Sequence, residues 1–328
     1  MSAPHSIRLS ALNSFYFGKI PSRGDFVKSS SGTNVITLFD NWVAQGMELL
    51  IADPAWKAVY DNAGAIDFFL AATHKRHAIC GSLVSSSDTS SRRFPFIAAT
   101  LFETEEPLTL LHLYPLVLEK HLNHQRALAH HATRAHDAVE VLAKLGSLAF
   151  EATAHAAETY EAFLTKASLT DLCRSLSLDN EAIAVRRMIL AIGYLLEPIL
   201  SNYAVPPQKG VALPLPSDPT RLALVKSLWL HLISIFLTRA EFELSIFSCA
   251  QHSSPRLIVT FNGTTPAAFQ TLFEERTAQE YVIDVVESDW VEDYIHRSPA
   301  TLKLSSYLEH ENLSLRQMVE TFRHAFSG

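Results

Sequence analysis

The first charged loop of this 328-residue chain contains Arg23, Gly24 and Asp25 and lies just after Pro21. The proline ring fixes its own φ, and glycine adopts backbone angles that are closed to other residues. The arginine and the carboxylate therefore project from a shaped loop. Opposite charges on the two sides of a glycine are suited to an ion pair or to a recognition surface. They do not form a catalytic set of residues.

A second charged loop contains Asp88, Arg92 and Arg93. Our hypothesis is that the two loops meet at one edge of a sheet, with Arg23 and Arg92 facing Asp25 and Asp88. Such a group has two interpretations. It is either a salt-bridge cluster that stabilises the fold or a surface that binds a partner or a ligand.

Fifteen histidines invite a metal interpretation, and His121, His124 and His131 fall on roughly one helical face. On a helix, however, positions 121 and 131 are about 15 Å apart along the axis, whereas metal–nitrogen bonds measure about 2 Å. His121 with His124, and likewise His74 with His77, lack further ligands nearby in the sequence. We therefore expect no metal site.

Catalytic motifs are also missing from the sequence. Cys80-Gly81-Ser82 resembles a nucleophile elbow only superficially, because the second glycine and the pattern around the serine are absent. No phosphate-binding glycine loop occurs, and the chain has only 11 glycines. We expect a protein that is not an enzyme and that has no cofactor.

Composition limits the class of protein further. The net charge of −7, from 27 basic and 34 acidic residues, argues against general nucleic-acid binding, which needs a concentrated basic surface. Three distant cysteines indicate neither a zinc ribbon nor a disulfide framework. The N-terminal residues lack a secretory pattern, and the apolar stretch Leu222–Leu237 carries Lys226 and His231, so we interpret it as a buried helix. The expected location is the cytoplasm.

The N-terminal part is predicted to alternate strands and helices. Thr33 is the expected N-cap of an amphipathic helix, in which Gly46 lies one turn beyond Trp42 and allows close approach of another element. Aromatic and branched runs predict strands. The expected elements are strands at Phe15–Lys19, Ile66–Ala71, Ala78–Val84 and Phe96–Phe102, and helices at Asn34–Leu50 and Pro54–Tyr60.

The remainder is predicted to be helix-rich. The proline- and glycine-rich segment Val205–Pro216 is interpreted as a non-regular connection. Thr264 or Thr265 is expected to cap a helix with Pro266 at its first position. The other expected elements are helices at Asn180–Leu196 and Thr220–Leu237, and strands at Phe242–Ser248 and Leu257–Phe261.

The predicted fold class is therefore α/β. We expect a mixed sheet covered by helices in an N-terminal domain over 10–115, a helical region over 116–204, and a helix-rich α/β C-terminal region over 205–328.

Three ordered motifs resemble a known family. The run Phe15–Val27 resembles the aromatic-Tyr-Gly-Lys-Leu-Pro-x-x-Gly-Asp-Phe opening of the TagF (ImpM) proteins, with Ile20 in place of leucine. Phe39–Val43 resembles their Trp-Asp-x-Trp-Leu motif. In Gly81–Phe96, the Asp, Arg and Phe-Pro positions of the family pattern match, while Ser85 replaces a proline and Ser91 replaces a glycine.

The resemblance implies a post-translational negative regulator of bacterial type VI secretion. The implied mechanism is binding and sequestration of the forkhead-associated (FHA) scaffold protein, with Arg23, Gly24, Asp25, Asp88 and Arg92 as motif-loop or partner-binding candidates. The alternatives are a small-ligand sensor or enzyme with a charged site between the motif loops, and a structural subunit of the secretion machine.

Overall fold

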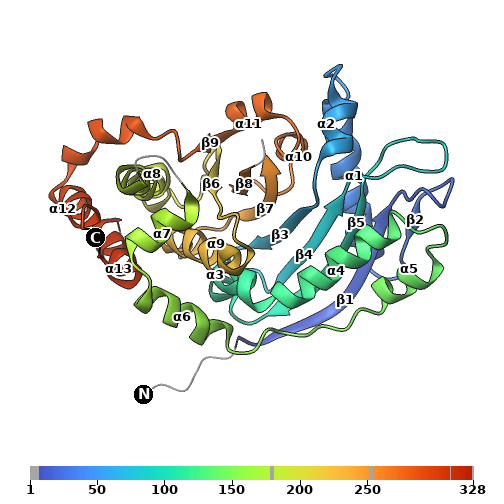
Figure 1. Ribbon diagram of the computed structural model, residues 1–328, viewed down its shortest axis with the longest axis horizontal. Coiled ribbons are helices and arrows are strands. Elements are labelled where there is room, and N and C mark those ends of the chain that lie inside the picture. The colour runs from blue at the N-terminus through green and yellow to red at the C-terminus, as the bar shows by residue number, and fades with distance from the viewer. Residues whose placement is uncertain (1–6, 178–180, 252–253, 311, 327–328) are drawn as a thin grey trace.

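The computed structural model describes residues 7–177, 181–251, 254–310 and 312–326. Nine strands of this part form one sheet with the order β2-β1-β5-β4-β3-β7-β8-β6-β9 (Figure 1). Neighbouring strands are antiparallel except for β6 and β9, which are parallel. The predicted α/β class is confirmed. The strands are β1 (Leu9–Gly18), β2 (Val27–Lys28), β3 (Ile66–Ala72), β4 (His77–Val84), β5 (Phe96–Thr104), β6 (Gly210–Pro214), β7 (Glu243–Gln251), β8 (Ser254–Thr260) and β9 (Val282–Asp284).

Helices cover both faces of this sheet (Figure 1). The N-terminal and middle helices are α1 (Thr33–Leu50), α2 (Trp56–Asn62), α3 (Pro107–Val117), α4 (Glu119–Ala132), α5 (Val139–Gly146), α6 (Ala156–Lys166), α7 (Leu169–Leu176) and α8 (Glu181–Ser201). The later ones are α9 (Pro219–Ser234), α10 (Pro266–Gln270), α11 (Glu275–Tyr281), α12 (Pro299–Leu308) and α13 (Leu315–Phe326). Short 3-10 helices lie at Ile235–Leu237, Asp289–Asp293 and Ile295–Arg297.

The central strands are apolar on both faces because each face has its own core. In β3, Phe68 packs into the core under α1 and α10, where its ring centre lies 5.4 Å from that of Phe39. The next residue, Phe69, points into the opposite core and stacks on Tyr114 of α3 at 4.0 Å. Successive strand residues point to opposite faces, so this alternation places one aromatic in each core.

The predicted N-terminal elements are all present, but β1 begins at Leu9 and not at Phe15, and α2 begins at Trp56 and not at Pro54. A further correction concerns the start of α1. Thr33 is the first helical residue, and the N-cap is Gly32 in a left-handed conformation with φ of 74°. Glycine accepts this conformation without strain, and the predicted threonine cap is therefore wrong. Gly46 does allow close approach, because a Cβ there would lie 2.5 Å from the ring of Phe269 in α10.

The segment Val205–Pro216 is not wholly irregular, because it contains β6. Val211 to Leu213 pair with β8 on one side, and β6 pairs with β9 on the other. The prolines stand before the strand or at its end, where a missing N–H costs least. The flanking prolines and glycine concealed the strand pattern of the apolar residues between them. The prediction of a non-regular connection is therefore wrong for the five residues of β6, Gly210–Pro214.

Other C-terminal predictions are confirmed. The side chain of Thr265 accepts a hydrogen bond from Ala268 N, with Pro266 as the first residue of α10. The helix predicted at Thr220–Leu237 is found as α9 and the 3-10 turn after it. The helix predicted at Asn180–Leu196 corresponds to α8, although Asn180 itself lies outside the described residues.

By length and composition, Pro219–Leu237 is the one helix of the described residues that could cross a membrane, with a mean hydropathy of 1.4. It is largely buried inside this protein, because 67% of its most apolar 18-residue stretch is buried, and Trp229 within it is fully buried. Core helices of globular proteins satisfy the same test. The interpretation of this stretch as a buried helix agrees with its packing.

Strands from the N-terminal and the C-terminal parts of the chain belong to the same sheet. β3 pairs along its length with β7, from Asp67 opposite Ser248 to Ala72 opposite Glu243. The division into 10–115, 116–204 and 205–328 stays a prediction, but the first and third of these ranges share a hydrogen-bonded sheet. The charged loops described next lie at the end of the N-terminal strands.

Candidate functional site

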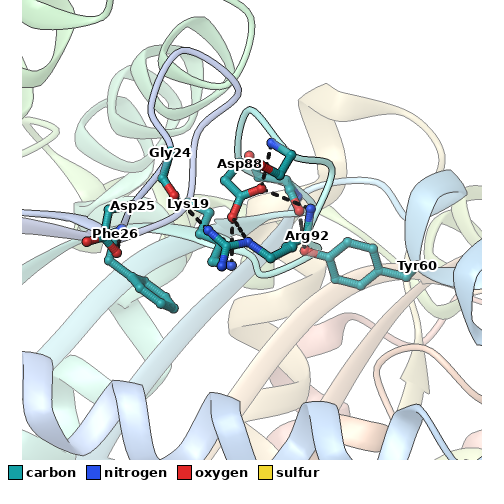
Figure 2. A network of polar contacts seen from close by, with 9 residues as sticks. Lys19, Gly24, Asp25, Phe26, Tyr60, Asp88 and Arg92 are labelled. Atoms are coloured by element: carbon teal, nitrogen blue, oxygen red, sulfur yellow. Dashed lines mark hydrogen bonds and ion pairs between the residues drawn. The ribbon is translucent and has the colours of Figure 1, made fainter.

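Asp88 is the centre of the motif-loop site (Figure 2). Its Oδ2 accepts hydrogen bonds from Lys19 Nζ at 3.0 Å and from Arg92 Nε at 2.7 Å. Its Oδ1 accepts from the backbone N–H groups of Ser90 at 2.9 Å and Arg92 at 3.0 Å. The Asp88 side chain is fully buried, so this carboxylate stabilises the turn around it and is not free for a ligand.

The two loops are joined directly to each other. Arg92 Nη2 donates to Gly24 O at 2.8 Å, and Thr89 N donates to Arg23 O at 3.0 Å. Figure 2 shows the loop with Gly24 beside the loop with Asp88 and Arg92. The hypothesis that the two motif loops meet at one edge of the sheet is confirmed.

Strand register explains why the loops meet. Gly18, the last residue of β1, pairs with Phe96 at the start of β5, and Val84 at the end of β4 pairs with the same residue. Both loops therefore leave the sheet from one point. Gly18 has φ of 137°, and a Cβ there would lie 2.1 Å from Pro95 O, so only glycine allows this close approach.

The expected pairing of the charges is wrong in one respect. Arg23 does not face Asp25 or Asp88; among the described residues its ion pair is with Asp137, at 3.9 Å and largely exposed. Asp25 Oδ1 accepts a hydrogen bond from Phe26 N at 2.8 Å. A bend at Gly24 directs these two side chains away from the buried carboxylate, which Lys19 and Arg92 occupy instead.

Three aromatic rings pack against one another beneath the first loop. Phe26 stacks on Phe17 with ring centres 5.4 Å apart and meets Phe94 edge-on at 4.9 Å. The Lys19 ammonium lies 5.1 Å from the Phe26 ring centre, which adds a cation–π attraction. Phe26 nevertheless remains 41% exposed, so part of an aromatic face is available at the surface.

The electrostatics keep Asp88 ionised. Desolvation by burial would raise the pKa of Asp88, but the hydrogen bonds from Lys19, Arg92 and Ser90 outweigh it and hold the pKa well below its usual range. A carboxylate that is ionised and fully hydrogen-bonded is a poor proton acceptor at neutral pH. The arrangement therefore suits rigid presentation of a surface more than proton transfer.

A second set of contacts fixes the far side of the second loop. Tyr60 Oη donates to Ser86 O and accepts from Ser86 N, both at 3.0 Å. Arg93 donates to both carboxylate oxygens of Asp61, at 2.7 and 2.5 Å. Bidentate pairs have fixed geometry, so α2 holds the loop from the side opposite to Lys19.

The exposed residues around the buried carboxylate form what we name the motif-loop surface: Arg23, Asp25, Phe26, Thr89 and Arg92. Arg23 and Arg92 have side-chain exposures of 48% and 63%. Among the candidates, Asp88 is thus a buried anchor, and Gly24 contributes its carbonyl. Arg23 and Asp25 are exposed charges, and Arg92 connects the anchor to the surface.

Sequence reasoning missed Lys19 and the hydroxyl of Tyr60. A lysine at the end of an aromatic strand is a usable signal, because a cation there needs a buried anion nearby. Tyr60 offers no comparable signal, since aromatic residues in helices usually serve packing.

The histidines His121, His124 and His131, considered as metal ligands, all lie on α4. His121 is buried, and its Nε2 lies 2.9 Å from Thr100 Oγ1. Burial lowers the pKa of His121. In the described ranges no group of three or more His, Cys, Asp or Glu side chains is arranged to hold a metal ion.

The fold and site together define an α/β domain with two interlocked loops at one end of its sheet. Residues 15–165 match the family model described as the TagF N-terminal domain, type VI secretion system-associated. This match assigns residues 15–165 to a type VI secretion-associated TagF N-terminal domain, and it confirms the resemblance of the motifs for this part of the chain.

The solved structures similar to this chain include that of PA0076 from Pseudomonas aeruginosa PAO1. The two chains are 17% identical, and the TM-score is 0.46 over 80% of this chain and 94% of that chain. No curated protein matches the chain.

Proposed function

We propose that this protein is a non-enzymatic, post-translational negative regulator of type VI secretion that acts in the cytoplasm by binding the FHA scaffold protein. The main support for this proposal is the motif-loop surface of the TagF domain. Its residues are exposed, and they are held in place by the fully buried carboxylate of Asp88, which accepts four hydrogen bonds. Repression then needs no chemistry, because a scaffold held in this complex does not support assembly.

Rigid anchoring supports a binding role. A loop ordered before association loses little conformational entropy when a partner arrives. The surface combines two arginines, one carboxylate and a partly exposed phenylalanine, and arginine and aromatic residues are enriched where binding energy concentrates. Under sequestration, the degree of repression follows affinity and the relative amounts of the two proteins.

A charge-swapped variant tests the surface. Arg23→Asp combined with Asp25→Arg keeps the net charge and leaves the Asp88 contacts in place, because neither side chain bonds to Asp88. We expect the same melting temperature as the wild type, loss of FHA scaffold in pull-downs from the native host, and increased secretion.

Arg174→Glu is the matched control, because Arg174 is an exposed, ion-paired arginine on α7. It should retain both scaffold binding and repression. Full scaffold binding by the charge-swapped variant would contradict the proposed surface, and absence of the scaffold from wild-type pull-downs would contradict the proposed partner.

A small-ligand or enzymatic site between the motif loops has less support. A hollow of about 420 Å³ does lie beside the second loop, where it is lined by Pro21, Ser85, Ser91 and Arg93 among others. None of Arg23, Asp25, Asp88 and Arg92 lines it. The four charged residues therefore lie outside the lining of this hollow.

Deletion of the gene separates the proposed regulator from a structural subunit. Loss of a repressor increases secretion, whereas loss of a subunit abolishes it. Loss of secretion in the deletion strain, restored when the gene is supplied again, would contradict the regulatory proposal.

A further inference from the structure

A second polar site lies where the N-terminal and C-terminal parts of the sheet join. A small, partly enclosed pocket of about 50 Å³ is bounded by β3, α3, α4, α9 and β7. We name it the Lys226 pocket. Its polar lining consists of Asp67, Tyr114, Glu119, Asn123, Arg126, Lys226 and Ser248.

Lys226 has no partner in the part of the chain that the structure describes. The residue is only 8% exposed, yet its ammonium makes no hydrogen bond and no ion pair with described residues. A buried ammonium without acceptors is costly, and proteins normally pair or solvate such a group. Burial lowers the pKa of Lys226, with the charge of Asp67 opposing that effect.

The carboxylate of Asp67 is bonded to other side chains, and among the described residues it makes no hydrogen bond or ion pair with Lys226. Asp67 Oδ1 accepts from Ser82 Oγ at 2.7 Å, and Asp67 Oδ2 forms an ion pair with Arg126. The positive charge of Arg126 is thereby balanced, and the charge of Lys226 is not. Glu119 is a second carboxylate of the lining, and burial raises its pKa while the charge of Lys226 opposes that effect.

Tyr114 is a second buried donor without a partner. The residue is 5% exposed, and its ring stacks on Phe69. Its hydroxyl makes no hydrogen bond with described residues, although buried tyrosine hydroxyls usually have one. The pocket is therefore lined by an ammonium and a hydroxyl for which the described residues provide no acceptor.

We propose that the Lys226 pocket binds a small monovalent oxyanion, with Lys226 and Tyr114 as its hydrogen-bond donors. The volume suits a group of the size of formate, acetate or bicarbonate, because one water molecule needs about 10–15 Å³ on the same measure and the pocket has room for several. Such an anion supplies the acceptor oxygens that both donors lack. It bridges α3 of the TagF domain and α9 of the C-terminal part.

The test measures anion binding to the full chain by calorimetry and by melting temperature, at constant ionic strength. Formate, acetate and bicarbonate are the probes, and chloride maintains the ionic strength. At least one probe should bind and raise the melting temperature, since a ligand of the folded state stabilises it. No binding of any probe would overturn the proposal and leave a water-filled pocket.

Variants locate the site. Lys226→Met should weaken binding of the probe roughly tenfold or more, because a charge-assisted hydrogen bond is lost. Lys209→Met, at an exposed lysine in the loop before β6, should bind the probe as the wild type does. Equal binding by Lys226→Met and the wild type would overturn the assignment.

Tyr114→Phe keeps the proposal testable if Lys226→Met does not fold. It removes one hydroxyl and keeps the ring stacked on Phe69, so the melting temperature without the probe should not change. Binding of the probe should weaken roughly threefold. Unchanged binding by this variant would remove Tyr114 from the site. These readouts do not depend on scaffold binding, so they stand or fall separately from the proposed function.

Discussion

The ammonium of Lys19 lies 3.0 Å from Oδ2 of Asp88, and this contact joins the end of β1 to a loop 69 residues later in the chain. The two side chains are 10% and 0% exposed. The contact connects the two motifs that the sequence displays separately. It makes their loops one unit, on which the motif-loop surface depends.

Removing the lysine should therefore destabilise the N-terminal domain. Lys19→Met leaves Asp88 with Arg92 alone as a cationic partner, and we expect a loss of about 1–3 kcal/mol in the free energy of unfolding. Urea denaturation measures it. Lys28→Met, at an exposed lysine of β2, should change the free energy by less than about 0.5 kcal/mol. Equal stability of the two variants would show that the Lys19 contact is not structural.

Gly46 should not tolerate even a methyl group. A Cβ at this position would lie 2.5 Å from the Phe269 ring, so Gly46→Ala should cost about 1–3 kcal/mol through overpacking. Alanine is the better helix former, so intrinsic propensity alone predicts the opposite sign.

Gly64→Ala is the matched control for Gly46, because nothing lies within 4 Å of a Cβ there. It should be neutral or slightly stabilising, since alanine restricts the unfolded chain. Thermal denaturation of both variants decides the matter. A stabilised Gly46→Ala would contradict the close packing of α1 on α10.

The stability of the fold should decrease as the pH falls from about 6.5 to about 3, because of two stacked histidines. His112 and His231 have ring centres 4.8 Å apart, and burial lowers the pKa of His112 to about 4 and that of His231 to about 3. Tyr160 Oη and Arg323 lie at the two nitrogens of His231, and the charges of Glu161 and Arg316 act nearby.

The sign follows from proton binding. Below pH 6.5 the unfolded state takes up protons that the folded state refuses, so stability falls with pH until the folded-state pKa values are reached. Allowing for partial solvent access, we expect on the order of 2 kcal/mol per ring. The double variant His112→Phe with His231→Gln should show a flatter pH profile in urea titrations. A profile as steep as that of the wild type would exclude these rings as the cause.

The three cysteines should be unreactive in the folded protein. Cys80, Cys173 and Cys249 are buried, and burial raises the pKa of the Cys249 thiol to about 12 and that of Cys80 as well. Because the thiolate is the reactive form, dithiobis(nitrobenzoate) at pH 8 should modify them only after denaturation, with three equivalents released. Rapid modification of any one in the native state would contradict its burial.

Local patterns predicted much of the fold. The strands at Ile66 and Ala78 and the helix α1 are marked by apolar periodicity, and Thr265 with Pro266 marks the start of α10. These features depend on near neighbours, so a single sequence contains them. The Gly32 cap was missed because a left-handed glycine competes with threonine for the N-cap position. Strand β6 was missed because prolines flank this short buried strand.

The sequence by itself determined the α/β class, most element positions and the motifs of the TagF domain. Only the tertiary structure decided that β3 pairs with β7, that Lys19 and not Arg23 reaches Asp88, and that Lys226 lies in a pocket with no partner among the described residues. These contacts join residues far apart in the chain. Strand register and packing select them from many combinations that are equally compatible with local pattern.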